Sequence, residues 1–174
     1  KDAIPSIDSP AFDSRFNGEG TDRVVVPDIP GEPFRAYPLR ILNFHEIVND
    51  RLGDIPIAVT WCPLCGTIVV YDRRVDDRTL SFGVSGKLAD DNLVMYDRET
   101  GTEWKQSLGE GIDGELACHS LDVLPAILTT WEQYRSMVGD PLVLQETRLE
   151  SEAASNTDEP AAIQLSLVES ASLV

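Results

Sequence analysis

The residues most able to do chemistry are two cysteines in the segment Thr-Trp-Cys-Pro-Leu-Cys-Gly-Thr at positions 60–67. The chain has only three cysteines, and Cys62 and Cys65 are separated by two residues. Such a pair forms a metal clamp, a thiol–disulfide redox couple or a tight structural disulfide. Pro63 fixes one backbone angle of the intervening turn, and Gly66 permits a left-handed conformation at its end.

The metal interpretation is the one that we expect first. A Cys-Pro-x-Cys-Gly turn points both sulfurs to the same side, as in the knuckles of rubredoxins and zinc ribbons, but those folds use two knuckles and this chain has one. A third ligand must therefore come from elsewhere, and His45, shortly before the strand that delivers the cysteines, is the preferred candidate. Cys118 and His119 are adjacent, so on an extended strand at most one could join a common site.

Two thiolates and one imidazole suit copper, especially Cu(I), with zinc as the alternative ion. Metal handling or electron transfer would follow from such a site. Hydrolytic zinc chemistry is less favoured, because Glu46 is the only neighbouring residue worth testing as a general base.

The alternative function is a thiol–disulfide oxidoreductase that uses the same two cysteines. Thioredoxin-like couples place the first cysteine at a helix N-terminus, where the helix dipole stabilises the thiolate. Here Cys65 is followed by Gly-Thr-Ile-Val-Val-Tyr, which favours a strand. The strand makes the redox interpretation less favoured but does not exclude it. An inert disulfide and two reduced thiols in the core are further alternatives.

Composition excludes one class of partner. The 174 residues carry 30 Asp and Glu against 14 Lys and Arg, a formal net charge of −16. Such a surface repels phosphate, so no nucleic-acid partner is expected. The same acidity is what solubility at high salt favours, although an ordinary acidic secreted protein would also show it. No run approaches the roughly 20 apolar residues of a spanning helix, and no leader is present in this chain.

The pattern of apolar residues predicts an α+β fold that is mainly β, a single domain of antiparallel hairpins. Strands are expected at 24–26, 55–61, 67–71, 79–84 and 142–144, with a turn at Asp76-Asp77 and a short helix near 38–42. One clear helix is predicted near 130–138. It has a capping-box pattern, with Thr129 as the N-cap and Glu132 three positions later.

The chain divides into three parts by composition: an extended lead-in over 1–22, a core domain over 23–145 and an acidic tail over 146–174. Within the tail, Ile163, Leu165 and Leu167 alternate with less apolar residues and predict an edge strand at 163–168. We expect this strand to dock on its own domain or on a neighbouring subunit. A homo-oligomer, and a role as a surface or filament assembly subunit, are therefore a further alternative.

Several segments together resemble a known family. They are Arg35–Arg40, Asn43–Asp50 (Asn-Phe-His-Glu-Ile-Val-Asn-Asp), Thr60–Thr67 and Asn92–Arg98. The chain is similar over about residues 1–145 to the bacterial and archaeal domain of unknown function 3179. The resemblance implies an extracytoplasmic location, secreted or at the cell surface, and supports Cys62, Cys65 and His45 as signature polar residues. It implies no role for Cys118 or His119.

Overall fold

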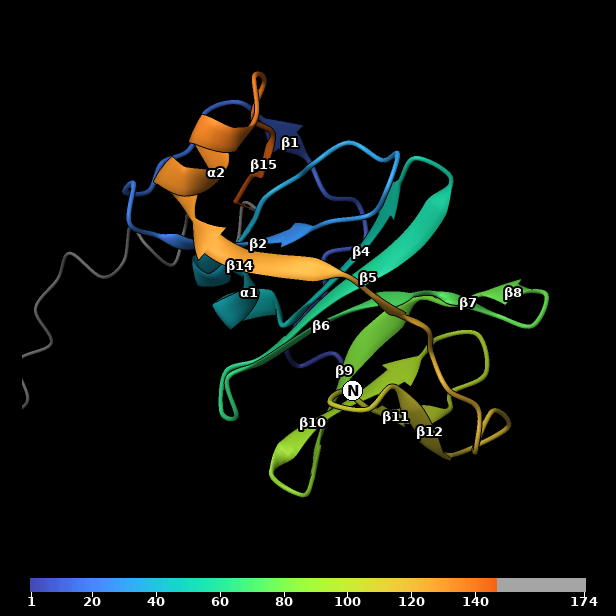
Figure 1. Ribbon diagram of the computed structural model, residues 1–174. Helices are drawn as coiled ribbons and strands as arrows, with labels where there is room; N and C mark the ends of the chain where they lie inside the picture. Colours follow the sequence, from blue (N-terminus) through green and yellow to red (C-terminus); the bar gives the residue numbers. More distant parts are fainter. Residues whose placement is uncertain (147–174) are drawn as a thin grey trace, which may run out of the picture.

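The centre of the fold is a four-stranded antiparallel sheet in the order β13–β6–β5–β4 (Figure 1). Its strands are β4 (Ile47–Leu52), β5 (Ile55–Cys62), β6 (Thr67–Asp72) and β13 (Val123–Leu124). The computed structural model describes residues 1–146. Within this part, the register runs from Ile47↔Thr60 between β4 and β5 and ends at Cys62↔Thr67 between β5 and β6.

Strand β5 is buried on both faces of the sheet. Because side chains alternate along a strand, Ile57, Val59 and Trp61 enter one core and Ala58 and Cys62 enter the other. A nearly continuous apolar and β-branched run, Ile-Pro-Ile-Ala-Val-Thr-Trp-Cys, suits this double burial better than a polar alternation would. The strand therefore fixes the position of Cys62 from both sides.

One layer covers the first face of this sheet. It contains a three-stranded sheet in the order β14–β2–β3, a two-stranded sheet β1–β15, and two short helices. The bounds are β1 (Phe12–Asp13), β2 (Arg23–Pro27), β3 (Tyr37–Pro38), α1 (Leu39–His45), β14 (Ala126–Thr130), α2 (Trp131–Met137) and β15 (Val143–Leu144).

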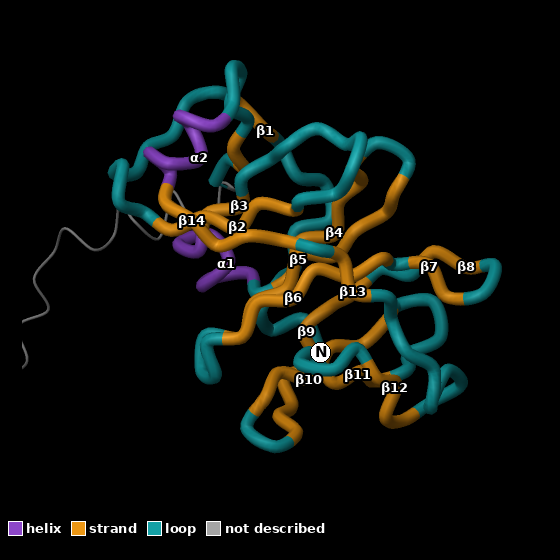
Figure 2. The backbone as a smooth tube through the Cα atoms, in the orientation of Figure 1, coloured by secondary structure: helices purple, strands orange, loops and turns teal. Residues whose placement is uncertain are grey.

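A second layer covers the opposite face. It is a four-stranded antiparallel sheet, β12–β11–β10–β9, with a small β7–β8 hairpin beside it (Figure 2). The bounds are β7 (Arg74–Val75), β8 (Arg78–Thr79), β9 (Phe82–Ala89), β10 (Asn92–Asp97), β11 (Glu103–Lys105) and β12 (Glu110–Asp113). Phe82, Met95 and Trp104 fill the core between this layer and the central sheet.

This architecture confirms the predicted fold class, a single mainly β domain of antiparallel strands with few helices. The strands expected at 55–61 and 67–71 are present as β5 and β6, and the turn at Asp76-Asp77 joins β7 to β8. The return strand expected at 79–84 is divided, because β8 ends at Thr79 and β9 begins at Phe82.

Two boundaries differ from the sequence prediction. The N-cap of α2 is Thr130, whose side chain accepts a hydrogen bond from the Gln133 backbone N–H. Thr129 lies one position too early to be the N-cap, and its hydroxyl donates to the Gln133 side-chain oxygen at 2.8 Å instead. Helix α1 extends to His45 rather than ending near 42, because Leu39, Ile41 and Leu42 are buried on one side of it.

No helix in residues 1–146 is long and apolar enough to cross a membrane. The predicted docking strand at 163–168 lies outside the described residues, as does nearly all of the acidic tail.

A buried hydrogen bond joins the first layer to the central sheet and makes a stability prediction. The Tyr37 hydroxyl donates to Asp50 Oδ2 at 2.6 Å, and Arg35 Nη1 lies 3.0 Å from the same oxygen. Burial is the main cause that raises the pKa of Tyr37 well above its ordinary value, and the charge of the nearby Asp50 carboxylate adds to it. The hydroxyl therefore stays protonated and remains a donor. Tyr37→Phe should lower the free energy of unfolding, measured in urea, by about 1.5–3 kcal/mol, because its acceptor is charged.

The matched control is Tyr134→Phe. The Tyr134 hydroxyl donates to the Leu142 carbonyl at 3.0 Å, a neutral acceptor, so about 0.5–1.5 kcal/mol should be lost. Equal losses in the two variants would contradict the importance given to the Asp50 contact.

Candidate functional site

The Cys-x-x-Cys segment forms the turn between β5 and β6. The strands pair as far as Cys62↔Thr67, and the four residues between them project beyond the sheet (Figure 2). Gly66 has a φ of 65° and its N–H donates to the Cys62 carbonyl at 2.8 Å, which closes the turn. The left-handed glycine predicted from the sequence is thus confirmed at Gly66.

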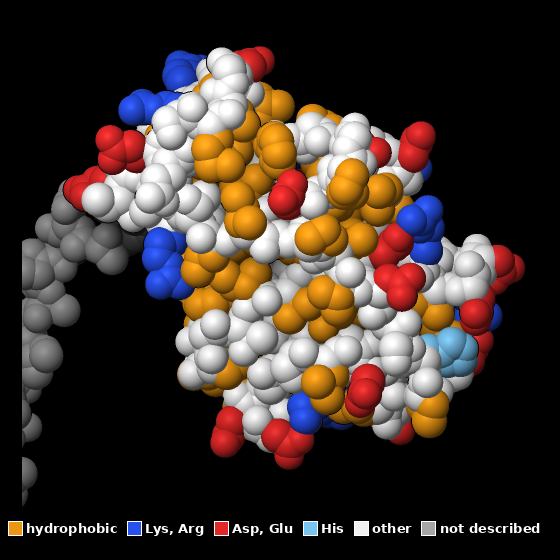
Figure 3. Space-filling model, in the orientation of Figure 1, with side chains coloured by type: hydrophobic (Ala, Val, Ile, Leu, Met, Phe, Trp, Pro, Cys, Tyr) orange, Lys and Arg blue, Asp and Glu red, His pale blue; other side chains and the backbone are white. Residues whose placement is uncertain are grey.

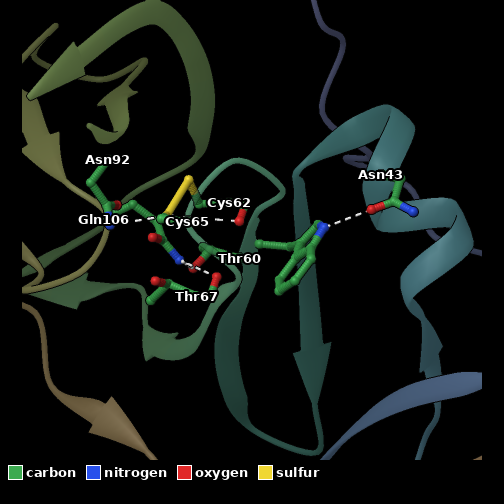
Figure 4. The surroundings of a disulfide bond; sticks show 8 residues. Asn43, Thr60, Cys62, Cys65, Thr67, Asn92 and Gln106 are labelled. Carbon is green, nitrogen blue, oxygen red and sulfur yellow. Dashed lines mark hydrogen bonds between the residues drawn. A yellow bond between two sulfur atoms is a disulfide. The ribbon is translucent and has the colours of Figure 1, made fainter.

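The turn brings the two sulfurs together as a disulfide (Figure 4). The Cα atoms of Cys62 and Cys65 are 5.6 Å apart, within the usual range for a disulfide. Their environments differ. Cys62 is only 1% exposed and lies in the core between the central sheet and the second layer, while Cys65 is exposed. Of the two cysteines, only Cys65 is therefore a residue on the molecular surface.

Polar side chains from the second layer lie against the disulfide. Asn92, the first residue of β10, donates a hydrogen bond from Nδ2 to Cys65 Sγ at 3.1 Å. Behind it, Gln106 Nε2 donates to Thr60 Oγ1 at 2.9 Å and to the Thr67 carbonyl at 3.2 Å (Figure 4). The strands on both sides of the turn are thereby tied to the segment after β11.

Two buried oxygens in this cluster, Asn92 Oδ1 and Gln106 Oε1, accept no hydrogen bond from the described residues. Buried acceptors are usually satisfied. A disulfide carries no donor, whereas a reduced cysteine carries an S–H. The Asn92 amide can therefore serve both forms of the pair: its N–H₂ solvates a sulfur or a thiolate, and its oxygen can accept from a thiol.

His45 is the last residue of α1 and is 3% exposed. Its Nδ1 lies 2.6 Å from the Pro5 carbonyl oxygen, so a proton on Nδ1 donates to that oxygen. The end of α1 runs beside the end of β5, because the Trp61 backbone N–H donates to the Glu46 carbonyl at 2.8 Å. The residue that follows His45 is thus bonded to the strand that carries Cys62.

The expected ligand set is only partly assembled. The structure brings Cys62 and Cys65 together, but residues 1–146 contain no group of three or more His, Cys, Asp or Glu side chains arranged to hold a metal ion. The two cysteines and His45 therefore do not form a ligand set in this oxidised form. Cys118 is a free, exposed cysteine, and His119 Nε2 lies 3.5 Å from Asp76 Oδ2.

A shallow pocket of about 240 Å³ lies next to the turn. Leu64, between the two cysteines and 78% exposed, forms part of its wall together with Glu46, Lys87 and Leu93. Burial raises the pKa of the Glu46 carboxyl above its ordinary value. The backbone of Glu46 has a φ of 59°, a conformation that is uncommon outside glycine, so the end of α1 holds this side chain in a constrained position.

Sequence reasoning missed Asn92 and Gln106. Asn92 lies in one of the segments that carry the family resemblance, which was the available signal, but nothing in the sequence placed it beside Cys65. Gln106 follows β11 with no distinctive pattern around it.

Comparison with known proteins identifies a family and no function. A family described as "Protein of unknown function (DUF3179)" matches residues 1–157. The chain belongs to this family. The match includes β4, β5, the disulfide turn and Asn92, so the whole site lies within the family domain. No curated protein and no solved structure matches the chain.

The contact between Asn92 and Cys65 makes a prediction for this family member. An N–H donor stabilises a thiolate more than a neutral disulfide sulfur, so it favours the reduced form. Asn92→Ala should make the midpoint potential of the pair more negative by about 10–30 mV, equivalent to about 0.5–1.4 kcal/mol for two electrons. Equilibration with glutathione buffers, followed by alkylation and mass spectrometry, measures this potential.

Asn43→Ala is the matched control. The Asn43 amide accepts from Trp61 Nε1 at 2.8 Å on the other face of β5 and has no bond to sulfur, so the potential should stay unchanged. Equal shifts in both variants would show that the Asn92 effect is one of general packing.

Proposed function

We propose that this chain is a thiol–disulfide oxidoreductase that acts outside the cytoplasm, with Cys62 and Cys65 as its redox couple. The observation that carries the proposal is the asymmetry of the disulfide. Cys65 is an exposed residue in the projecting turn, whereas Cys62 is held in the core at the end of the central strand. Among the functions predicted from the sequence, this one needs no residue beyond those already in contact.

The exchange has two steps that balance in atoms and electrons. A thiolate of a partner dithiol attacks Cys65 Sγ, the Cys62–Cys65 bond breaks, and Cys62 departs as a thiolate that takes up a proton. The second thiolate of the partner then attacks the partner's first sulfur, which is bonded to Cys65 in the mixed disulfide, and releases Cys65 as a thiolate. The partner is oxidised by two electrons and the Cys62–Cys65 pair is reduced; the reverse sequence reduces a partner disulfide.

The surroundings support attack at Cys65. Asn92 places an N–H donor on its sulfur, which stabilises the thiolate released in the second step. The neighbouring pocket beside Leu64 gives an approaching polypeptide an apolar surface to contact. Strand β6, not a helix, follows Cys65, so this local donor replaces the helix dipole of thioredoxin-like couples.

The activity predicts a simple assay with insulin as the probe. The protein should accelerate the reduction of insulin disulfides by dithiothreitol by about tenfold or more over the uncatalysed rate, followed by turbidity. Cys65→Ser and Cys62→Ser should each return the rate to the uncatalysed value, because each removes one sulfur of the couple.

Cys118→Ser is the control for this assay, because it removes an exposed cysteine that lies outside the disulfide. It should retain the full rate. A wild-type protein that does not accelerate the reaction, or a Cys65→Ser variant as active as wild type, would contradict the proposed activity.

A metal site is the second candidate function, favoured by the position of His45. Metal-bound histidines usually donate their other ring N–H to a carbonyl or carboxylate, which is the contact of His45 Nδ1 with the Pro5 carbonyl. Reduction of the disulfide would supply two thiolates, and with the imidazole these suit Cu(I), or zinc as the alternative. The bound ion would serve metal handling or electron transfer.

Titration of reduced protein with Cu(I) against a chromophoric competitor, without oxygen, tests this second candidate. His45→Asn should weaken binding by about tenfold or more, whereas His119→Asn, at the exposed histidine, should leave it unchanged. Wild-type protein that binds no stoichiometric copper or zinc, or a Cys62→Ser variant with undiminished affinity, would exclude the site.

The extracytoplasmic part of the proposal is supported by the disulfide itself, because such bonds persist in oxidising compartments. The surplus of carboxylates suits an environment of high salt. Homo-oligomerisation through the C-terminal tail, with the associated assembly role, stays a prediction that concerns residues outside the described part.

A further inference from the structure

An apolar groove of about 370 Å³ lies between β6 and β14, on a different part of the molecule from the disulfide pocket. Every residue that lines it is Val, Ile, Leu, Ala or Pro, and they come from 68–70, from 123–128 and from Val25. Val123 is 63% exposed and Leu128 is 46% exposed. Figure 3 shows hydrophobic side chains gathered on the face that carries these strands.

Two backbone edges border the groove. Strand β13 pairs with β6 only at Tyr71 and Val70, after which the chain leaves for β14, so no described strand lies opposite Ile68. The Asp72 N–H donates to the Asp122 carbonyl, so the backbone groups of residue 72 point away from β5. Backbone groups point to alternate sides along a strand, so those of Val70, which pairs with Leu124, and of Ile68 point the same way, toward the groove.

Strand β14 presents the second edge. It pairs with β2 on one side and has no partner among the described strands on the other. The Asp28 N–H donates to the Pro125 carbonyl and the Trp131 N–H donates to the Asp22 carbonyl, which assigns the odd-numbered positions of this segment to β2. Residues 126, 128 and 130 therefore turn their backbone groups outward. An exposed apolar edge of this kind is usually covered in native proteins.

We propose that residues 163–168 of the same chain cover this groove, adding as a strand along the outer edge of β14. Ile163, Leu165 and Leu167 would lie in the groove and Gln164 and Ser166 would face solvent. The composition fits the site: residues 160–168 contain no charged side chain, in a chain whose net charge is −16, and the groove lining contains none either.

The chain is long enough for the segment to reach its own domain. Residue 163 follows Glu146 by 17 positions, which span up to roughly 55–60 Å when extended. A flexible linker of that length has a root-mean-square span of about 20–25 Å, comparable with the roughly 15 Å radius of gyration of a domain of this size. The effective concentration of a tethered segment reaches the millimolar range, which favours docking within one molecule over docking between two.

Hydrogen–deuterium exchange on the full chain tests the proposal against a chain that ends at Pro160. In the full chain, the groove-facing amides of residues 126, 128 and 130 and of Ile68 should exchange about tenfold or more slowly than in the truncated one. Peptides from β5 should be unchanged, because that strand is paired on both sides.

Two point variants of equal charge separate strand docking from a general effect of the tail. Leu165→Asp places a charge in the groove and should reproduce the truncation, whereas Ser166→Asp places it toward solvent and should behave as wild type. Equal exchange in full-length and truncated chains, or equal effects of the two variants, would overturn the proposal.

The assignment to a single molecule has its own test. Protection should be independent of protein concentration from about 1 to 100 µM, with a monomeric mass by light scattering. Protection that rises with concentration together with a dimeric mass would overturn docking within one molecule and replace it by strand exchange between copies.

Discussion

The double burial of β5 is the constraint on which the rest of the structure depends. Its residues enter two cores alternately, so the layers above and below the central sheet are both built on the same eight residues. A shift of one position would turn Trp61 and Cys62 to the opposite faces, which ties the register of the whole molecule to this strand. The end of β5 is accordingly a rigid support for a reactive turn.

That support explains how the disulfide becomes asymmetric. Cys62 is the last paired residue of β5 and belongs to the core between the central sheet and the second layer. Cys65 lies in the projecting turn and is exposed. No helix begins at either cysteine, since β6 follows the turn directly. The polarity of the site comes instead from side chains of the neighbouring layer, above all from Asn92. The polar environment of the cysteine pair therefore depends on long-range packing.

The sequence was informative where local pattern determines structure. The β-branched runs that flank the cysteines form β5 and β6, Gly66 has the left-handed conformation expected of it, and the apolar face of Trp131 and Tyr134 forms α2. The N-cap is Thr130 rather than Thr129, because α2 begins at Trp131 and its Gln133 N–H reaches the Thr130 hydroxyl. The polar surroundings of the disulfide could not be predicted, because Asn92 reaches Cys65, and Gln106 reaches Thr60, only after two sheets have packed.

His45 shows the same limit from the other direction. Its place beside the end of β5 agrees with its proximity in sequence to the strand that delivers the cysteines, yet its Nδ1 contacts the Pro5 carbonyl of the N-terminal segment, forty residues away. The proposed metal site would need the reduced form of the cysteine pair, and sequence does not specify the oxidation state of that pair.

The midpoint potential of the Cys62–Cys65 pair tests the central claim most directly. Catalytic couples lie between about −120 and −270 mV, whereas structural disulfides lie below about −300 mV. The wild-type protein, equilibrated against defined glutathione buffers, should give a reversible two-electron potential within the catalytic range. A potential below about −300 mV, or a pair that does not equilibrate with the buffer, would contradict a redox role and identify the disulfide as a structural bond.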